Sequence, residues 1–166
     1  IPDYYMLNTD LSNLDYRSIG DIESYNSYNR PIEVVDEHGV HTAILWGYNG
    51  MYTIATVKNM TWSELQSLLM LQSDAPLTGA LDDTQRATLY GKTGVLVDAY
   101  EYEPLVGMTK HYDNNGKIIT YGYDSFGRLT STSDEMGGIQ LYRYNLSGGD
   151  SPSLDMGDIT LTPSNP

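Results

Sequence analysis

Cysteine is absent from this chain of 166 residues. Without a thiol the chain can form no disulfide, no thiolate metal site and no cysteine nucleophile. The absence of cysteine does not indicate whether the protein works in an oxidising or a reducing compartment. Basic residues are also scarce: nine Lys and Arg stand against 22 Asp and Glu, which gives a net charge of -13. This charge repels phosphate backbones and anionic lipids, so we expect no nucleic-acid partner.

Long apolar runs are missing as well. The longest surrounds residues 68–71 and is far shorter than the roughly 20 residues that a membrane-spanning helix needs, so no membrane insertion is expected. The aromatic residues are one Phe and two Trp beside 15 Tyr. Tyrosine joins a large apolar ring to a polar hydroxyl, which suits the half-buried face of a β-sheet.

The tyrosines recur at a fixed spacing. Three Tyr-x-Tyr pairs follow one another at intervals of 21 residues: Tyr100 and Tyr102, Tyr121 and Tyr123, Tyr142 and Tyr144. Fixed-period self-similarity indicates a repeat architecture. An interval of this length holds two strands, so successive pairs are expected on strands of the same direction, in rows across one sheet.

Turns that begin with Asp and end with Gly separate the predicted strands. They are Asp36 to Gly39, Asp113 to Gly116, Asp124 to Gly127 and Asp134 to Gly137. The Asp side chain can accept hydrogen bonds from the backbone that follows it, and Gly can adopt a positive φ. Residues 25–39 align without a gap on residues 123–137, which indicates a degenerate second copy of the same unit.

These signals predict a mainly β fold, a β-rich α+β arrangement in which antiparallel meanders of hairpins form a curved sheet. Asn49-Gly50 is a strong signal for a two-residue hairpin turn. The first meander occupies residues 25–59, with strands at 31–35, 40–48 and 51–58. The second occupies residues 93–145, with strands at 95–102, 106–112, 117–123, 128–133 and 139–144.

A helical insert at residues 60–92 separates the two predicted meanders. Thr61 and Glu64 form a capping-box pattern, and an apolar stripe at helical spacing follows as far as Gln72. A second, weaker helix is expected from Asp82 or Asp83 to Tyr90. The insert therefore predicts two short helices.

The two ends of the chain give weaker patterns. Residues 1–24 are hard to interpret, although Tyr4 lies 21 residues before Tyr25 and hints at a decayed repeat. The chain begins with Ile1, and we expect it to be cut from a longer protein, because such repeats occur in arrays. Residues 146–166 are acidic and rich in Pro and Gly, which predicts a flexible tail, with 159–162 as a candidate edge strand.

Metal and catalytic chemistry have little support in the sequence. His38 and His41 flank one turn, but zinc needs further defined ligands, and the acidic turns lack the closing Glu of a calcium loop. Asp98 and Glu101 are the acidic residues nearest to an apolar run, and no nucleophile elbow is present. We therefore expect no metal, no cofactor and no enzyme activity.

The aromatic rows permit two interpretations. Trp46 and Tyr48 together with the three tyrosine pairs could stack on sugar rings, as in carbohydrate-binding sheets. The same side chains at fixed repeat positions could instead be the cross-strand ladder that holds the sheet in register. The fixed positions favour the ladder, with a glycan as the alternative partner.

The unit Tyr-Asp-x-x-Gly-Arg at residues 123–128, followed by Asp134-x-x-Gly137 and the Tyr142 pair, resembles the YD repeat of Rhs-type proteins, which also occurs in teneurins and in toxin-complex shells. Residues 102–109 resemble the C-terminal repeat region of Bacteroidetes YD-repeat proteins. The resemblance implies a secreted or cell-surface protein whose hairpins wind into a curved sheet. It suggests a non-catalytic module that packs, through its sheet edges, with itself or with the rest of its parent protein. Encapsulation of a toxin and self-cleavage are not implied, because the array is short and the cleavage motif is not visible.

Overall fold

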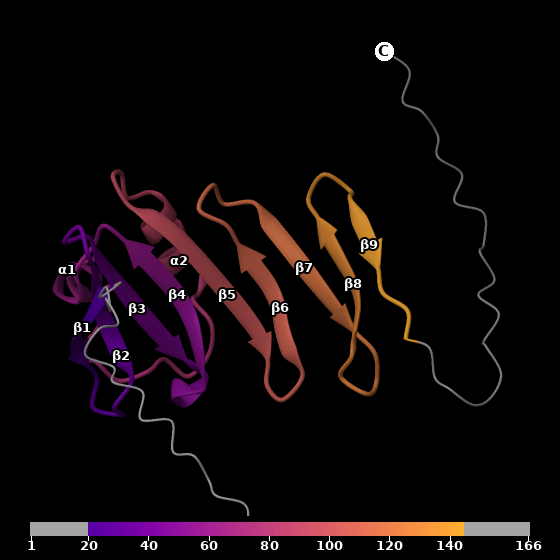
Figure 1. The fold of residues 1–166 in the computed structure, drawn as a ribbon, viewed down its shortest axis with the longest axis horizontal. Helices are drawn as coiled ribbons and strands as arrows, with labels where there is room; N and C mark the ends of the chain where they lie inside the picture. Colours follow the sequence, from indigo (N-terminus) through magenta and orange to yellow (C-terminus); the bar gives the residue numbers. More distant parts are fainter. Residues whose placement is uncertain (1–19, 145–166) are drawn as a thin grey trace, which may run out of the picture.

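Nine β-strands form one sheet in this computed structural model, which describes residues 20–144. Consecutive strands pair antiparallel throughout, so the order of the strands in space is their order in the chain (Figure 1). The strands are β1 (Gly20–Tyr25), β2 (Pro31–Asp36), β3 (His41–Gly47), β4 (Tyr52–Lys58), β5 (Leu96–Glu103), β6 (Gly107–Tyr112), β7 (Ile118–Tyr123), β8 (Leu129–Asp134) and β9 (Ile139–Leu141). The prediction of a mainly β, antiparallel fold is confirmed.

The two predicted meanders are two parts of this one sheet. Strand β4 pairs directly with β5, so that Val57 lies opposite Val97 and Ala55 opposite Ala99. These four side chains share one face and are all buried, which makes the pairing favourable despite the long segment between the two strands. The chain leaves the sheet after β4, forms the insert and returns beside the strand that it left.

Two short helices make up the regular part of the insert: α1 (Trp62–Leu68) and α2 (Asp83–Tyr90). Each begins with a capping box, formed in α1 by Thr61 with Glu64 and in α2 by Asp82 with Gln85. Helix α1 ends at Leu68 and not near Gln72 as predicted, because the chain turns sharply at Met70, whose φ is 53°. The apolar stripe beyond Leu68 therefore lies on a loop.

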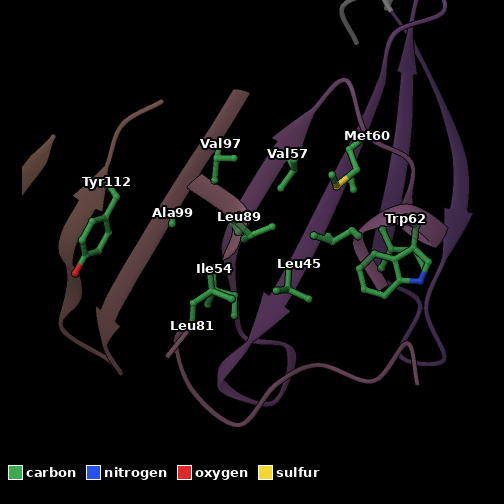
Figure 2. Close-up of a cluster of buried hydrophobic side chains, with 14 residues drawn as sticks. Leu45, Ile54, Val57, Met60, Trp62, Leu81, Leu89, Val97, Ala99 and Tyr112 are labelled. Carbon is green, nitrogen blue, oxygen red and sulfur yellow. The ribbon is translucent and has the colours of Figure 1, made fainter. Parts of the chain in front are cut away.

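The hydrophobic core lies between these helices and one face of β3, β4 and β5 (Figure 2). Leu45 on β3, Ile54 on β4, Leu65 on α1 and Leu89 on α2 are fully buried in it. The strands supply alternating apolar residues on this face, and each helix supplies one apolar side. The buried hydrophobic residues are Ile32, Ala43, Leu45, Ile54, Ala55, Val57, Met60, Trp62, Leu65, Leu81, Leu89, Val97, Ala99 and Tyr112.

The helices cover only part of the sheet. They lie behind the half of the sheet that contains β3, β4 and β5, while β7, β8 and β9 extend away from them (Figure 1). Within residues 20–144 no element covers this outer part, and Ile139 and Leu141 on β9 are 68% and 67% exposed. The sheet therefore changes from two layers to one along its length.

The connection between β3 and β4 differs from the predicted two-residue turn. Residues Tyr48–Gly50 form a short 3-10 turn, and Tyr48, Asn49 and Gly50 all have positive φ. The insert accounts for this geometry, because Leu77 donates to the carbonyl of Trp46 (2.9 Å) and accepts from the N–H of Asn49 (3.0 Å). This backbone pairing with a distant segment overrides the local preference of Asn-Gly.

At the ends of the described region, β1 was not predicted from the sequence, and it takes up residues 20–24 of the segment that gave no clear pattern. Strand β9 ends at Leu141, three residues short of the predicted end. The expected repeat at Tyr4 and the flexible tail at 146–166 lie outside the described residues. Neither helix found in residues 20–144 is long and apolar enough to cross a membrane.

Candidate functional site

Five turns between strands share one hydrogen-bonding pattern. The first side chain of each turn accepts, through Oδ1, the N–H groups of the residues two and four positions later, at 2.8–3.0 Å. The fourth residue has a positive φ in every case. The turns begin at Asn26, Asp36, Asp113, Asp124 and Asp134.

The turn at Asn26 shows how the degenerate copy keeps the geometry. Asn26 replaces Asp, and its Oδ1 accepts from Tyr28 (3.0 Å) and Arg30 (2.9 Å). Asn29 replaces Gly and takes a φ of 56°, which Asn tolerates better than most residues. The amide oxygen therefore substitutes for the carboxylate, while Asn26 Nδ2 is buried and finds no partner among residues 20–144.

The carboxylates of these turns are held in their ionised form. The pKa values of Asp36, Asp113 and Asp124 lie below the ordinary range, chiefly because each accepts the backbone N–H four residues later. Asp124 also accepts from Arg128 Nε at 2.8 Å. A carboxyl group whose pKa is lowered in this way is ionised and bonded to its own turn. It therefore acts as a structural hydrogen-bond acceptor and is a poor general acid.

Acidification should therefore destabilise the fold. Because the folded-state pKa of these three Asp residues lies below the unfolded value of about 3.9, their contribution to stability is complete above that pH. It is lost as the pH falls through the folded-state pKa values. We expect the thermal midpoint, measured by circular dichroism, to fall below about pH 4.

The matched variant replaces Asp36, Asp113 and Asp124 with Asn, which keeps the Oδ1 acceptor as Asn26 does. It should be less stable at neutral pH and should lose less stability on acidification than the native chain. Comparing the two proteins at each pH cancels the effect of the other acidic groups. If the thermal midpoints of the two proteins fell in parallel with pH, these three carboxylates would contribute nothing to the acid sensitivity of the fold.

The predicted ladder residues fall into several separate contacts. Tyr48 and Tyr102 meet in one cluster with Tyr52, in which the rings of Tyr52 and Tyr102 stack at 4.4 Å and Tyr48 lies edge-on to both. The Tyr48 hydroxyl accepts the N–H of Tyr102 at 2.9 Å. Sequence reasoning missed Tyr52, whose signal was its place on the strand after the Asn-Gly turn.

The second tyrosine of the later pairs packs on the preceding hairpin and not on another tyrosine. Tyr123 donates its hydroxyl to the carbonyl of Met108 (2.8 Å), and its ring lies where a Cβ on Gly107 would be. The ring of Tyr144 lies 5.2 Å from the guanidinium of Arg128. Each repeat is thus linked to the one before it by contact between a tyrosine and a turn.

Three hairpins repeat the same register, including its irregular step. Tyr25 lies opposite Pro31, Tyr102 opposite Met108 and Tyr123 opposite Leu129, and a bulge or irregularity precedes each pair. The β5–β6 hairpin is therefore a copy of the same unit, although Glu103 stands in place of the Asp that opens the turn. The repeat extends through the structure further than the turn sequences indicated.

The first tyrosine of each pair has different neighbours. The ring of Tyr100 stacks on His111 at 5.0 Å, and His111 Nε2 lies 2.9 Å from Asp98 Oδ1. Tyr121 lies opposite Thr132 on β8, and the N–H of Tyr142 donates to Thr130. Because one face of the Tyr100 ring is taken by His111, stacking on a sugar is restricted to its other face.

Trp46, the other candidate for sugar stacking, is also engaged. Its Nε1 donates to the carbonyl of Pro31 at 2.7 Å, and the guanidinium of Arg30 lies 5.2 Å from its ring. Burial raises the pKa values of Tyr100, Tyr102 and Tyr123, so these hydroxyls stay protonated at neutral pH. Trp46, Tyr48 and Tyr123 thus each make a side-chain hydrogen bond within the fold.

The acidic residues nearest to an apolar run do not form a catalytic pair. Asp98 and Glu101 are an odd number of positions apart on β5 and therefore point to opposite faces of the sheet. Burial tends to raise the pKa of Glu101, but hydrogen bonds from Tyr112 (2.6 Å) and Lys110 outweigh it, and the pKa is lowered. Neither geometry nor protonation fits a paired acid and base.

Metal ligands do not cluster in the described part of the chain. Within residues 20–144 there is no group of three or more His, Asp or Glu side chains that could hold an ion. His41 Nδ1 instead lies 2.6 Å from Glu33, whose other oxygen accepts the N–H of Trp62. Glu33 therefore links β2, β3 and the start of α1.

A further link between the insert and the sheet was not visible in the sequence. Asp74 accepts the backbone N–H and the hydroxyl of Ser27, each at 3.0 Å, and so ties the insert to the β1–β2 turn. These residues lie 47 positions apart, and an Asp in a loop carries no signal for a partner at that distance.

Comparison with known proteins yields one family and a distant structural likeness. Residues 107–139, which run from β6 to the start of β9, match the family described as RHS Repeat. The crystal structure titled TcdB2-TccC3-Cdc42 contains a chain with 12% identity and a TM-score of 0.27, and the match covers 69% of this chain and 8% of that one. No curated protein matches the sequence. The matched residues contain the Asp113 and Asp124 turns and the Tyr121 pair, so this part of the chain is similar to the Rhs, or YD, repeat.

Proposed function

We propose that this chain is a non-catalytic structural and interaction module of a secreted or cell-surface repeat protein. Its tyrosine-rich sheet would pack with the rest of its parent protein or with another copy. The observation that carries this proposal is the uninterrupted sheet, whose outer strands β1 and β9 each have one neighbouring strand within residues 20–144. An outer strand presents N–H and C=O groups that can pair with a further strand.

The chemistry of the repeat supports the same role. The turn carboxylates accept hydrogen bonds from their own turns, and the repeated tyrosines contact the hairpins before them. The carboxylates thus hold their own turns, while Tyr123 and Tyr144 hold one unit on the next. Stability then comes from each unit and its interface with the neighbouring unit, as in other repeat proteins.

The test is the mass of the chain in solution. Sedimentation velocity over a wide range of protein concentrations should show species heavier than the 18.5 kDa chain, increasing with concentration. A single species with the mass of one chain at every concentration would contradict self-association as the role of the open edges.

Carbohydrate binding through the aromatic side chains stays a prediction. The test is a titration of tryptophan fluorescence with glycans chosen from an array. Saturable quenching that is lost in a Trp46→Phe variant would favour this alternative, and a flat response to every glycan would count against it.

A further inference from the structure

Within residues 20–144, the outer side of β9 presents a row of backbone hydrogen-bonding groups that face no other strand. The N–H of Tyr142 donates to the carbonyl of Thr130, and the carbonyl of Gly138 accepts from the N–H of Asp134. The backbone N–H and C=O groups of the even-numbered residues therefore point toward β8. Successive residues of a strand direct these groups to alternate sides. Ile139, Leu141 and Arg143 therefore direct their N–H and C=O groups away from the sheet.

The side chains of β9 are unusual for an exposed edge. Ile139 and Leu141 point to one face and are both largely exposed, while Arg143 is the one charged residue between 139 and 144. Open edges are normally protected by charges, prolines, bulges or very short strands. Strand β9 is short, with three residues, but it carries an apolar pair, no charge and no proline, and Arg143 lies two residues beyond its end.

The opposite edge is protected. Strand β1 carries Asp21 and Glu23 within six residues, and its register with β2 shifts at Glu23. Pairing two copies of β1 would bring acidic side chains together in a chain whose net charge is already -13. The two edges of the same sheet thus differ in their capacity for self-pairing.

We propose that β9 pairs antiparallel with β9 of a second copy, which joins two sheets into one across a two-fold axis. This inference rests on the proposed function and names the edge and the partner. With the axis beside Leu141, this residue faces its equivalent in the second copy, and Ile139 faces Arg143. The arrangement adds no contact between acidic residues.

Two-fold symmetry also makes the assembly finite. The same strand serves both copies, so the pairing closes at a dimer in which the acidic β1 is the outer strand at each end within residues 20–144. Pairing of β9 with β1 of another copy would leave an open edge at each end and would propagate as a filament. The charge on β1 disfavours that alternative.

The first experiment compares two lysine substitutions on exposed residues of the two edge strands. Leu141→Lys should weaken the dimer by at least about tenfold, because two lysines would face each other where two leucines pack. Ile22→Lys on β1 is the matched control and should leave the dimer constant unchanged. Ile22 is 48% exposed, so both variants should keep the native circular dichroism spectrum.

A second experiment locates the axis by cross-linking. The chain has no cysteine, so Leu141→Cys introduces a single thiol. Directly opposed residues in a hydrogen-bonded antiparallel pair have Cα atoms about 5.5 Å apart, which suits a disulfide. Oxidation with diamide should give a covalent dimer from Leu141→Cys much faster than from the Ile22→Cys control.

The outcomes separate the inference from the function on which it rests. Association that survives Leu141→Lys and is lost in Ile22→Lys would overturn the assignment to β9 while the proposed function stands. Equal cross-linking rates for the two cysteine variants would overturn the two-fold axis at Leu141. A native chain that stays monomeric at every concentration would overturn both self-association and the dimer.

Discussion

Replacing Leu45 with Ala should lower the free energy of unfolding by about 2–5 kcal/mol. Leu45 is 1% exposed on β3 and lies in the core between the sheet and the helices (Figure 2). Removing its branched end takes apolar atoms out of the core and leaves a cavity that the packed strands around it can fill only in part. Urea denaturation followed by circular dichroism measures the loss directly.

Leu96→Ala is the matched control for this experiment. Leu96 lies on β5 and is 51% exposed, so the same change of side chain removes little buried surface and should cost less than about 0.5 kcal/mol. Equal losses in the two variants would show that the core does not lie where the two layers meet.

Gly47→Ala should destabilise the fold by about 1–3 kcal/mol or detach the insert from the end of β3. A Cβ at Gly47 would collide with the carbonyl oxygen of Gly79 and would lie 2.6 and 2.9 Å from two side-chain carbons of Ile54. Because one obstacle is backbone and the other is a fully buried side chain, neither can move without breaking neighbouring contacts. Thermal unfolding and near-ultraviolet circular dichroism would detect the change.

The facing residue supplies the control. A Cβ on Gly79 would meet no atom within 4 Å, and its φ lies outside the positive range, so Gly79→Ala should be neutral or slightly stabilising. Both variants add one methyl group to the same junction. A stable Gly47→Ala variant with native spectra would mean that residues 76–79 do not pack against β3.

Features whose physical cause is local were predicted from the sequence. The capping box at Thr61 and the turns at Asp113 and Asp124 depend on side chains that bond within four residues. The residue types at those spacings were therefore enough to predict these local features. The alignment of residues 25–39 on 123–137 places Asn26 at the position of Asp124, but no turn was predicted there.

Features that depend on distant partners were missed. Strand β1, with the sequence Gly-Asp-Ile-Glu-Ser-Tyr, has few residues that favour strands and is held in the sheet by its pairing with β2. The geometry at Asn49 depends on Leu77, and the direct pairing of β4 with β5 closes across the insert. None of these pairings leaves a signal in nearby residues.

For the candidate site, the period located the tyrosines but not their contacts. Spacing placed Tyr102, Tyr123 and Tyr144 at equivalent positions, and the natural prediction was contact between tyrosines. The structure places Tyr123 on Gly107 and Tyr144 on Arg128, because each ring reaches back to the turn of the preceding hairpin. A register shift precedes Tyr123 in the β7–β8 pair, and a sequence period does not reveal such a shift.

The pairing of β4 with β5 has a consequence for how the chain folds. Every other strand pair in the sheet is joined by a short connection, whereas this pair brings Lys58 beside Leu96 and encloses the whole insert. Loop-closure entropy makes such a contact the slow one to form, while the hairpins on either side can form early from neighbouring residues. We therefore expect the closure of the insert, which lies outside the sheet, to be the main kinetic barrier to completing the sheet.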